Sequence, residues 1–165
     1  MFTAGCNIRL ARYVVLTKII NTITRSKNMN KVIDKLAWIF IEDGKLLMVR
    51  SKGKELFYLP GGKREAGESD EQALVREIKE EISVDLVPDS IKYVETFTGQ
   101  ADGKAEGVSV QLTCYLADYT GELAPDAEIE ELKFVDGNDR AVCSLAALVA
   151  LDWLEANQYL PLISK

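Results

Sequence analysis

The sequence predicts a single α/β domain in which a mixed β-sheet lies between helices. The apolar patterns follow the order strands, one central helix, more strands and a last helix, which is typical of a sheet covered by helices. The 165 residues are enough for one domain with a substantial core. The composition, 47% hydrophobic and 28% charged, is ordinary for a globular protein. We therefore expect one domain over residues 29–165.

The segment 1–28 differs from the rest of the chain in charge. It holds five basic residues and no acidic residue, although the net charge of the whole chain is -6. Such a segment fits a transit peptide, a helical extension that packs on the domain, or an upstream extension of the reading frame before Met29. We expect this N-terminal extension to be incidental to the chemistry. Its basic residues are Arg9, Arg12, Lys18, Arg25 and Lys27.

The first strands follow from the apolar runs between residues 36 and 63. Residues 36–51 hold two such runs separated by Asp43-Gly44, which is a strong hairpin signal and predicts two antiparallel strands. Residues 55–63 predict a short aromatic strand, because the run ends at Pro60 and two glycines.

The second half of the chain predicts further strands and a final helix. Residues 90–100 and 107–121 are rich in β-branched and aromatic residues, so we expect neighbouring strands joined by a loop. Residues 130–137 predict a weaker strand. Residues 139–160 predict a mostly buried helix, because apolar residues recur at helical spacing. These apolar residues are Leu145, Leu148, Leu151 and Trp153.

The central helix is predicted from a capping signal and an apolar stripe. Ser69 followed by Gln72 fits a capping box, so the helix should begin near Asp70. Apolar residues then recur at i, i+4 and i+8 and form a stripe that can pack on the sheet. The stripe comprises Leu74, Ile78 and Ile82, widened by Ala73 and Val75.

The composition excludes several classes of site and partner. The chain has no histidine, so carboxylates rather than an imidazole must do any acid-base chemistry. The three cysteines have no CxxC spacing and do not fit a disulfide framework or a zinc site. An acidic chain is a poor general binder of nucleic acid. No apolar run approaches the roughly 18 residues of a membrane span.

Four carboxylates are predicted to converge where a glycine-rich loop meets the central helix. Glu77, Glu80 and Glu81 lie within about one turn of helix, where each like-charged pair costs roughly 0.2–0.5 kcal/mol. Glu68 precedes the helix in a loop whose glycines let it fold back beside that turn. Such oxygen ligands suit Mg²⁺ or Mn²⁺, whose charge would offset the repulsion. The alternative is a solvated, glutamate-rich helix surface.

The spacing of these residues resembles the Nudix box of the Nudix (MutT-related) hydrolases. The pattern is a glycine, five residues, Glu, seven residues, and then Arg-Glu-aliphatic-x-Glu-Glu. One position departs, because Ser83 stands where the family has a glycine that would ease the helix end. The resemblance also implies the family's α/β/α sandwich. In this chain the pattern comprises Gly62, Glu68, Arg76, Glu77, Ile78, Glu80 and Glu81.

The resemblance implies a metal-dependent hydrolase of a diphosphate linkage in a nucleoside diphosphate derivative. Mg²⁺, with Mn²⁺ as the alternative ion, would be bound by Glu77, Glu80, Glu81 and the carbonyl of Gly61. Glu77 would also deprotonate the attacking water, or would share that role with a carboxylate outside the box.

Two further box residues and one glutamate outside the box complete the implied catalytic set. Glu68 would contact the metal site or orient the base, and Arg76 would hold Glu68 or a neighbouring carboxylate in place. Glu128, before the last predicted strand, is the best placed candidate for a further metal-binding or basic glutamate. Glu130 and Glu131 are the alternatives. All three could instead belong to an acidic, solvated loop.

Substrate contacts outside the metal site are expected from Arg50, Lys63 and Tyr58. Arg50 and Lys63 flank the proposed site in the sequence and could bind phosphate, although Arg50 could equally be a charge at the end of a strand. Tyr58 and Phe57 alternate along the aromatic strand, so one would face a nucleotide base and the other the core. We expect Phe57 in the core.

Missing subgroup motifs favour a MutT-like enzyme. No proline occurs between Pro88 and Pro125, where typical ADP-ribose hydrolases of the family carry one, and the motifs of the NADH and coenzyme A groups are absent. We therefore expect a (deoxy)nucleoside triphosphate that is cleaved to the monophosphate and pyrophosphate. ADP-ribose, a nucleotide sugar or a dinucleotide is the enzymatic alternative, and a non-catalytic, nucleotide-sensing Nudix domain is the third.

Partners and location follow by analogy with the family. We expect a small-molecule nucleotide substrate, no stable complex with nucleic acid and no membrane partner. We also expect a homodimer in the cytoplasm.

Overall fold

The computed structural model of the chain describes residues 31–161, so the predicted extension 1–28 lies outside the described residues. In chain order the elements are β1 (Lys31–Trp38), β2 (Ile41–Glu42), β3 (Lys45–Ser51), α2 (Asp70–Ile82), β4 (Asp85–Leu86), a 3-10 turn (Pro88–Ser90), β5 (Lys92–Gln100), β6 (Val108–Leu116), β7 (Tyr119–Thr120), β8 (Ile129–Val135), a second 3-10 turn (Arg140–Val142) and α3 (Leu145–Ala156). Neither α2 nor α3, the helices described, is long and apolar enough to cross a membrane.

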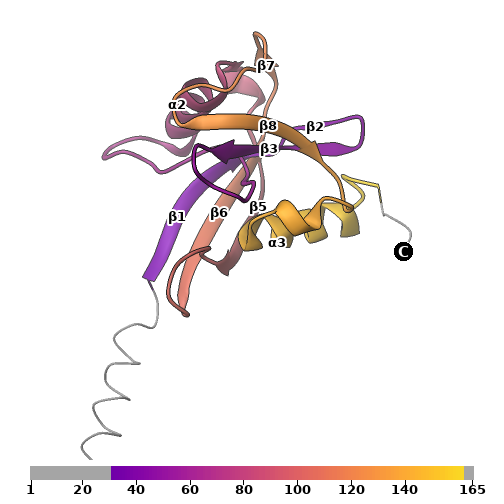
Figure 1. The fold of residues 1–165 in the computed structure, drawn as a ribbon. Coiled ribbons are helices and arrows are strands. Elements are labelled where there is room, and N and C mark those ends of the chain that lie inside the picture. The colour runs from indigo at the N-terminus through magenta and orange to yellow at the C-terminus, as the bar shows by residue number, and fades with distance from the viewer. Residues whose placement is uncertain (1–30, 162–165) are drawn as a thin grey trace, which may run out of the picture.

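The strands lie between α2 and α3 (Figure 1). One sheet is mixed, because its central strand β6 runs parallel to β1 and antiparallel to β5. A second sheet is antiparallel, with β3 between β2 and β8, and β4 pairs separately with β7. Helix α2 packs against β1, and α3 packs against β5. The predicted α/β class, with a mixed sheet between helices, is confirmed.

Two apolar cores lie on opposite faces of β1 and its continuation. Leu36 and Trp38 pack with the apolar stripe of α2, whereas Ala37 and Ile39 pack with α3. All four are fully buried. Because both faces are covered, this strand is a continuous apolar run and shows none of the alternation of a half-exposed strand. The same reasoning applies to residues 46–49 of β3.

The Asp43-Gly44 turn forms as predicted, but it joins shorter strands than expected. Both residues have positive φ, 50° and 72°, as a type I′ hairpin turn requires, and Ile41 and Glu42 pair antiparallel with β3. The sequence predicts that the whole run from residue 36 forms one strand that pairs antiparallel with the next run. This prediction is wrong for residues 36–38. The chain changes sheets after Trp38, so β1 pairs in parallel with β6 instead.

The predicted aromatic strand at residues 55–63 is reduced to two isolated bridges. Tyr58 pairs antiparallel with Val49, and Phe57 pairs in parallel with Cys143. Because the two neighbours are bonded to different segments, no continuous ladder forms. Phe57 is 5% exposed, so its predicted place in the core is confirmed.

The last helix begins later than predicted. A 3-10 turn precedes Ser144, whose Oγ accepts a hydrogen bond from the backbone N–H of Ala147 and starts α3. Leu151 is fully buried, but Leu145 is 47% exposed. The expectation that Leu145 faces the core is therefore wrong. It occupies the first helical position, and the small Ala146, Ala147 and Ala150 are among the buried residues of the same helix.

Helix α2 begins and ends with local structure that the sequence signals. The Ser69 Oγ accepts from the Gln72 N–H and the Gln72 side chain accepts from the Ser69 N–H, so the predicted capping box is confirmed. At the other end, Ser83 adopts a left-handed conformation with φ 63° and ψ 10°. Its N–H donates to the carbonyl of Lys79 at 3.1 Å. Ser83 thus adopts the geometry that a glycine would favour there.

This geometry predicts that Ser83→Gly stabilises the protein by about 1 kcal/mol. A left-handed conformation costs a non-glycine residue roughly 1–2 kcal/mol, and the extra freedom of glycine in the unfolded chain offsets part of the gain. The Ser83 Oγ lies 3.4 Å from Asp126, so its removal costs little. Urea denaturation measures the free energy of unfolding. Ser90→Gly, where φ is not positive, is the control and should not stabilise; a loss of stability in Ser83→Gly would contradict the prediction.

Candidate active site

The loop before α2 is fixed to β1 by two backbone hydrogen bonds. The Leu36 N–H donates to the Gly62 carbonyl at 2.8 Å, and the Trp38 N–H donates to the Pro60 carbonyl at 2.9 Å. Gly61, between them, has φ 129°, and a Cβ there would overlap the Leu36 carbonyl oxygen. The Gly61 carbonyl accepts no hydrogen bond from any residue within 31–161, so it is free for a ligand.

Glu81 is the buried carboxylate of the site. It is 8% exposed, and its Oε2 accepts a hydrogen bond from the Gly61 N–H at 2.7 Å. The pKa of Glu81 is raised to about 7, chiefly by burial and in addition by the negative charges of Glu128 and Glu77. The hydrogen bond from Gly61 and the positive charge of Lys35 act in the opposite direction. A carboxylate in these surroundings favours a nearby cation.

Glu77 lies against the same glycine loop. A Cβ on Gly62 would overlap the carboxylate of Glu77, so only a glycine allows this close approach. The Glu77 Oε1 accepts from the Arg76 Nη1 at 3.0 Å, and the Glu77 side chain is 18% exposed. The backbone of the loop and the carboxylates of α2 are thus in direct contact.

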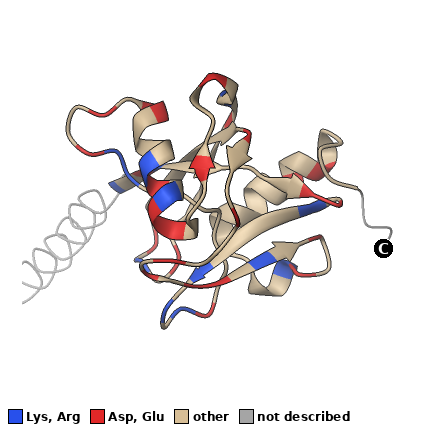
Figure 2. Ribbon diagram, turned by 90° about the horizontal axis from the view of Figure 1, so that it is seen from above, with Lys and Arg blue, Asp and Glu red and all other residues tan. Residues whose placement is uncertain are grey.

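Arg76 joins Glu68 to the helix through paired hydrogen bonds. Its Nε and Nη2 donate to the two oxygens of Glu68 at 2.7 and 2.8 Å, and Nη2 also donates to the Lys63 carbonyl at 3.0 Å. These bonds, with one from the Glu65 N–H, lower the pKa of Glu68 to about 2. The contact between Arg76 and Glu68 that the sequence predicts is therefore present. Figure 2 shows basic residues along α2 between acidic residues at its two ends.

Glu80 differs from its two neighbours in the predicted metal set. Its side chain is 57% exposed, and its nearest basic group is the Arg76 Nη1 at 3.5 Å. Within residues 31–161 no three acidic side chains lie close enough together to form a complete metal site. The donor set still fits a hard divalent cation, because carboxylate oxygens and a free carbonyl are its preferred ligands. Glu81 contacts Gly61 and Glu77 lies against Gly62, whereas the Glu80 side chain is mostly exposed.

Of the three glutamates outside the box, the structure brings one to the site. The charge of Glu128 is close enough to Glu81 to raise the pKa of that group. Glu130 and Glu131 instead form ion pairs with Arg50, at 2.9 and 2.6 Å. The proposed phosphate contact of Arg50 is not favoured by this geometry, because both of its acidic partners lie on β8 and its guanidinium is occupied. Arg50 fits the alternative reading, a charge at the end of a strand.

A small cavity of about 150 Å³ lies beside Tyr58 and Leu59, which precede the glycine loop in the chain. Tyr58 lines it, together with Lys35 of β1 and Asp102 of the loop after β5. Burial raises the pKa of Tyr58, and the negative charge of Asp102 adds to this effect. Sequence reasoning missed Lys35 and Asp102. No local pattern marks them, because only the pairing of β1 with β6 and the course of the loop bring them beside Tyr58.

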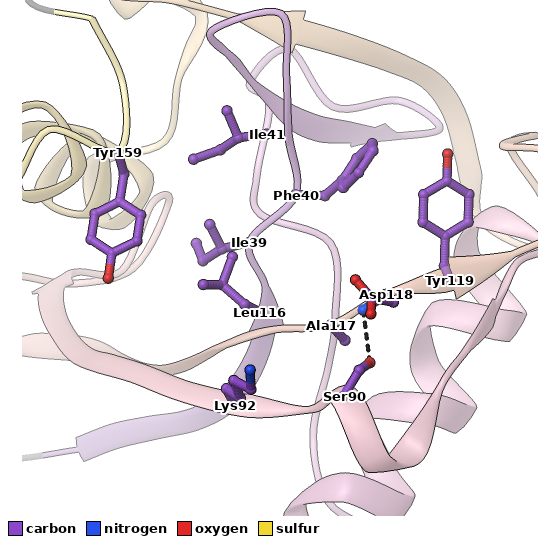
Figure 3. Close-up of a pocket in the computed structure, with 10 residues that line it drawn as sticks. All are labelled: Ile39, Phe40, Ile41, Ser90, Lys92, Leu116, Ala117, Asp118, Tyr119 and Tyr159. Carbon is purple, nitrogen blue, oxygen red and sulfur yellow. Dashed lines mark hydrogen bonds between the residues drawn. The ribbon is translucent and has the colours of Figure 1, made fainter.

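A larger cavity of about 620 Å³ lies elsewhere on the molecule (Figure 3). Apolar side chains such as Ile39, Ile41 and Leu116 face Tyr159 across it, and the Asp118 N–H donates to the Ser90 Oγ on its rim. None of the predicted site residues lines it. Of these two cavities, the smaller one contains a predicted site residue, Tyr58, and it also contains Lys35, whose charge acts on Glu81.

Comparison with known proteins gives a family match and several relatives. The NUDIX domain family model matches residues 34–159. The ADP-ribose pyrophosphatase of Methanocaldococcus jannaschii is 35% identical over 104 residues, which are 61% of this chain and 60% of that protein. YvcI, an uncharacterized Nudix hydrolase of Bacillus subtilis, is 32% identical over 98 residues, which are 59% of this chain and 61% of that protein. The chain thus spans about three fifths of the length of both relatives.

Solved structures extend the similarity to the fold. The solution structure of the E. coli ORF135 protein matches with a TM-score of 0.56 and 28% sequence identity. The match covers 81% of this chain and 92% of that one.

The burial of Glu81 predicts that the metal-free protein loses stability as pH rises. The pKa of Glu81 is about 7 in the folded protein, against an ordinary value of 4.5, so the unfolded chain releases a proton that the folded chain keeps. The free energy of unfolding therefore falls from about pH 5 to about pH 8, by up to about 3 kcal/mol. The charged groups that face Glu81 are Glu77, Glu128 and Lys35.

Urea denaturation with a chelator, at several pH values, measures this dependence. Glu81→Gln should flatten the curve, because it removes the titrating group and keeps the volume. Glu71→Gln, at an exposed position of the same helix, should leave the curve unchanged. An equally steep fall in Glu81→Gln would show that another group is responsible.

Proposed function

The chain belongs to the Nudix family, and on that premise we propose that it is a Nudix hydrolase that cleaves a diphosphate linkage in a nucleoside diphosphate derivative. One observation carries the proposal more than any other. Glu81 is buried against the backbone N–H of Gly61, with the charges of Glu77 and Glu128 close by. A solvated, glutamate-rich helix surface would not bury a carboxylate in this way.

We expect the site to hold Mg²⁺, or Mn²⁺ in its place. Glu77, Glu80, Glu81 and the carbonyl of Gly61 would be its ligands, since they are hard oxygen donors on two adjoining segments. The ion, when bound, would neutralise charge on the phosphate oxygens and lower the pKa of a water molecule.

The side chains have separate roles in the proposed reaction. Glu77 accepts the proton that the attacking water loses, and Glu128 is the alternative base. Glu68 and Arg76 fix the orientation of Glu77, because Arg76 donates to both carboxylates. Lys63 binds a phosphate of the substrate. The same role suits Lys35, which lies near Glu81 and lines the small cavity.

A (deoxy)nucleoside triphosphate is our first candidate substrate, with the monophosphate and pyrophosphate as products. The cavity beside Tyr58, about 150 Å³, suits one base and leaves little room for a second nucleoside group. ADP-ribose is the second candidate, because the Methanocaldococcus jannaschii relative is named for that substrate. A sensor that binds without cleavage is less favoured, since all four box glutamates are present. A homodimer in the cytoplasm remains a prediction from the sequence alone.

Product release from a substrate panel tests this proposal. The panel comprises canonical and oxidised (d)NTPs, ADP-ribose, nucleotide sugars and dinucleoside polyphosphates, each with Mg²⁺ and with chelator. Metal-dependent release of pyrophosphate from one triphosphate is the expected result. Cleavage of ADP-ribose or a nucleotide sugar alone would support the proposed hydrolase activity and overturn the proposed triphosphate substrate. Tight binding of a nucleotide without any cleavage would overturn the enzymatic proposal.

The role of Glu77 predicts that Glu77→Gln lowers turnover by at least about 100-fold, since a general base contributes roughly 10²–10⁴-fold. The fold should persist, because one charge is lost but almost no volume. Turnover with Mg²⁺ and the unfolding temperature are measured together. Glu71→Gln, exposed near the start of the same helix, is the matched control and should turn over normally. Normal turnover in Glu77→Gln would exclude Glu77 as the base.

A further inference from the structure

A second arginine, Arg64, joins the glycine loop to β1 and to α2. The Arg64 Nε and Nη2 donate to the two oxygens of Asp70 at 2.6 and 2.9 Å, and its Nη1 donates to Asp34 at 2.6 Å. The hydroxyl of Tyr115 donates to the same Asp70 at 2.5 Å. These four side chains, which we call the Arg64 cluster, come from β1, the glycine loop, the first turn of α2 and β6.

All the nitrogens of Arg64 are occupied within this cluster. Its hydrogen bonds lower the pKa of Asp70, so the pair stays fully charged near neutral pH. Three of the five N–H donors of Arg64 are engaged by the two carboxylates, so a substrate phosphate would have to compete with Asp70 and Asp34 for this side chain. The neighbouring Lys63 is different, because its side chain forms no ion pair within the described residues 31–161. The two neighbouring basic residues thus differ: Lys63 is available to a substrate, whereas Arg64 holds the loop.

The two arginines together fix the loop at two points. Arg76 reaches from α2 to Glu68 and to the Lys63 carbonyl, and Arg64 reaches from the loop to the start of α2 and to β1. The segment with the free carbonyl of Gly61 leads directly into these contacts, which begin at Lys63 and Arg64. The position of the loop relative to α2 therefore depends on both arginines as well as on the backbone hydrogen bonds to β1.

The exposure of the Arg64 cluster indicates what it contributes. The side chains of Arg64, Asp70 and Asp34 are 27%, 37% and 51% exposed. Exposed ion pairs add little to stability, even though several joined in a network can add more. Bonds that orient the groups around a metal act differently, because their loss typically weakens metal binding or activity by 10–100-fold. The cluster bonds to none of the proposed metal ligands directly, so its effect on them acts through the position of the glycine loop.

We propose that Arg64 is a positioning residue of the metal site. Through Asp70 and Asp34 it holds the glycine loop against the first turn of α2, so that the carbonyl of Gly61 and the carboxylates of α2 meet one ion. This inference rests on the proposed function, since it assumes a divalent cation at Glu77 and Glu81. Arg64 itself touches neither the ion nor the substrate.

Metal binding without substrate tests this proposal in the full chain. Titration of Mn²⁺, followed by its electron paramagnetic resonance signal, should show about tenfold weaker binding for Arg64→Ala than for the wild type. Arg64→Lys should lie between the two, because a lysine reaches one carboxylate but cannot span both. Arg140→Ala is the matched control. Arg140 also bridges two acids, Asp152 and Glu155, but on α3.

Three results separate positioning from a general loss of structure. The unfolding temperatures of Arg64→Ala and Arg140→Ala should fall by similar small amounts, while only Arg64→Ala weakens Mn²⁺ binding and lowers kcat at saturating substrate. Tyr115→Phe removes one hydroxyl from the cluster and should give a smaller loss of affinity in the same direction. If Arg64→Ala does not fold, the Mn²⁺ affinity of Tyr115→Phe tests the positioning role instead.

Wild-type affinity for Mn²⁺ in Arg64→Ala, or an equal loss in Arg140→Ala, would overturn the inference. If Arg64→Ala is unfolded, wild-type affinity in Tyr115→Phe would do the same. Each of these results leaves hydrolysis by the wild type intact, so the proposed function would survive it. Failure of the wild type itself to bind Mn²⁺ would instead overturn the proposed function.

Discussion

The close approach of the Gly61-Gly62 backbone to its two neighbours is the constraint on which the rest of the site depends. A side chain on Gly61 would overlap the Leu36 carbonyl of β1, and one on Gly62 would overlap the carboxylate of Glu77. With only hydrogens there, the loop bonds to β1 on one side and lies against α2 on the other. The hydrogen bond from the Gly61 N–H to Glu81 depends on this packing.

Helix α2 serves both the core and the chemistry, and the two uses conflict at Glu81. The apolar stripe that anchors the helix includes Ile78 and Ile82, which are fully buried. Glu81 lies next to this stripe and is buried with it, which raises its pKa and makes its charge costly. A single hydrogen bond from Gly61 offsets part of that cost. A bound cation would offset the remainder, so the raised pKa of Glu81 and the proposed affinity for metal have the same origin.

The elements of the fold and the box residues could be predicted from the sequence because local signals encode them. The capping box at Ser69 and the turn at Asp43-Gly44 are examples. The partner of β1 could not be predicted, since a run buried on both faces carries no mark of its neighbour. Lys35 and Asp102 were missed for the same reason, because they reach the small cavity only through the pairing of distant segments. Of the two roles left open for Arg50, its ion pairs with two acids on β8 favour a charge at the end of a strand.

The most direct test of the account is a crystal structure with Mn²⁺ and a non-hydrolysable nucleoside triphosphate, in which anomalous scattering locates the metal. The account predicts Mn²⁺ bound by Glu77, Glu81 and the carbonyl of Gly61, with Glu80 turned inward to join them. It also predicts the base in the cavity beside Tyr58. A metal bound away from α2, or a nucleotide seated in the larger cavity of Figure 3, would contradict the assignment of the site.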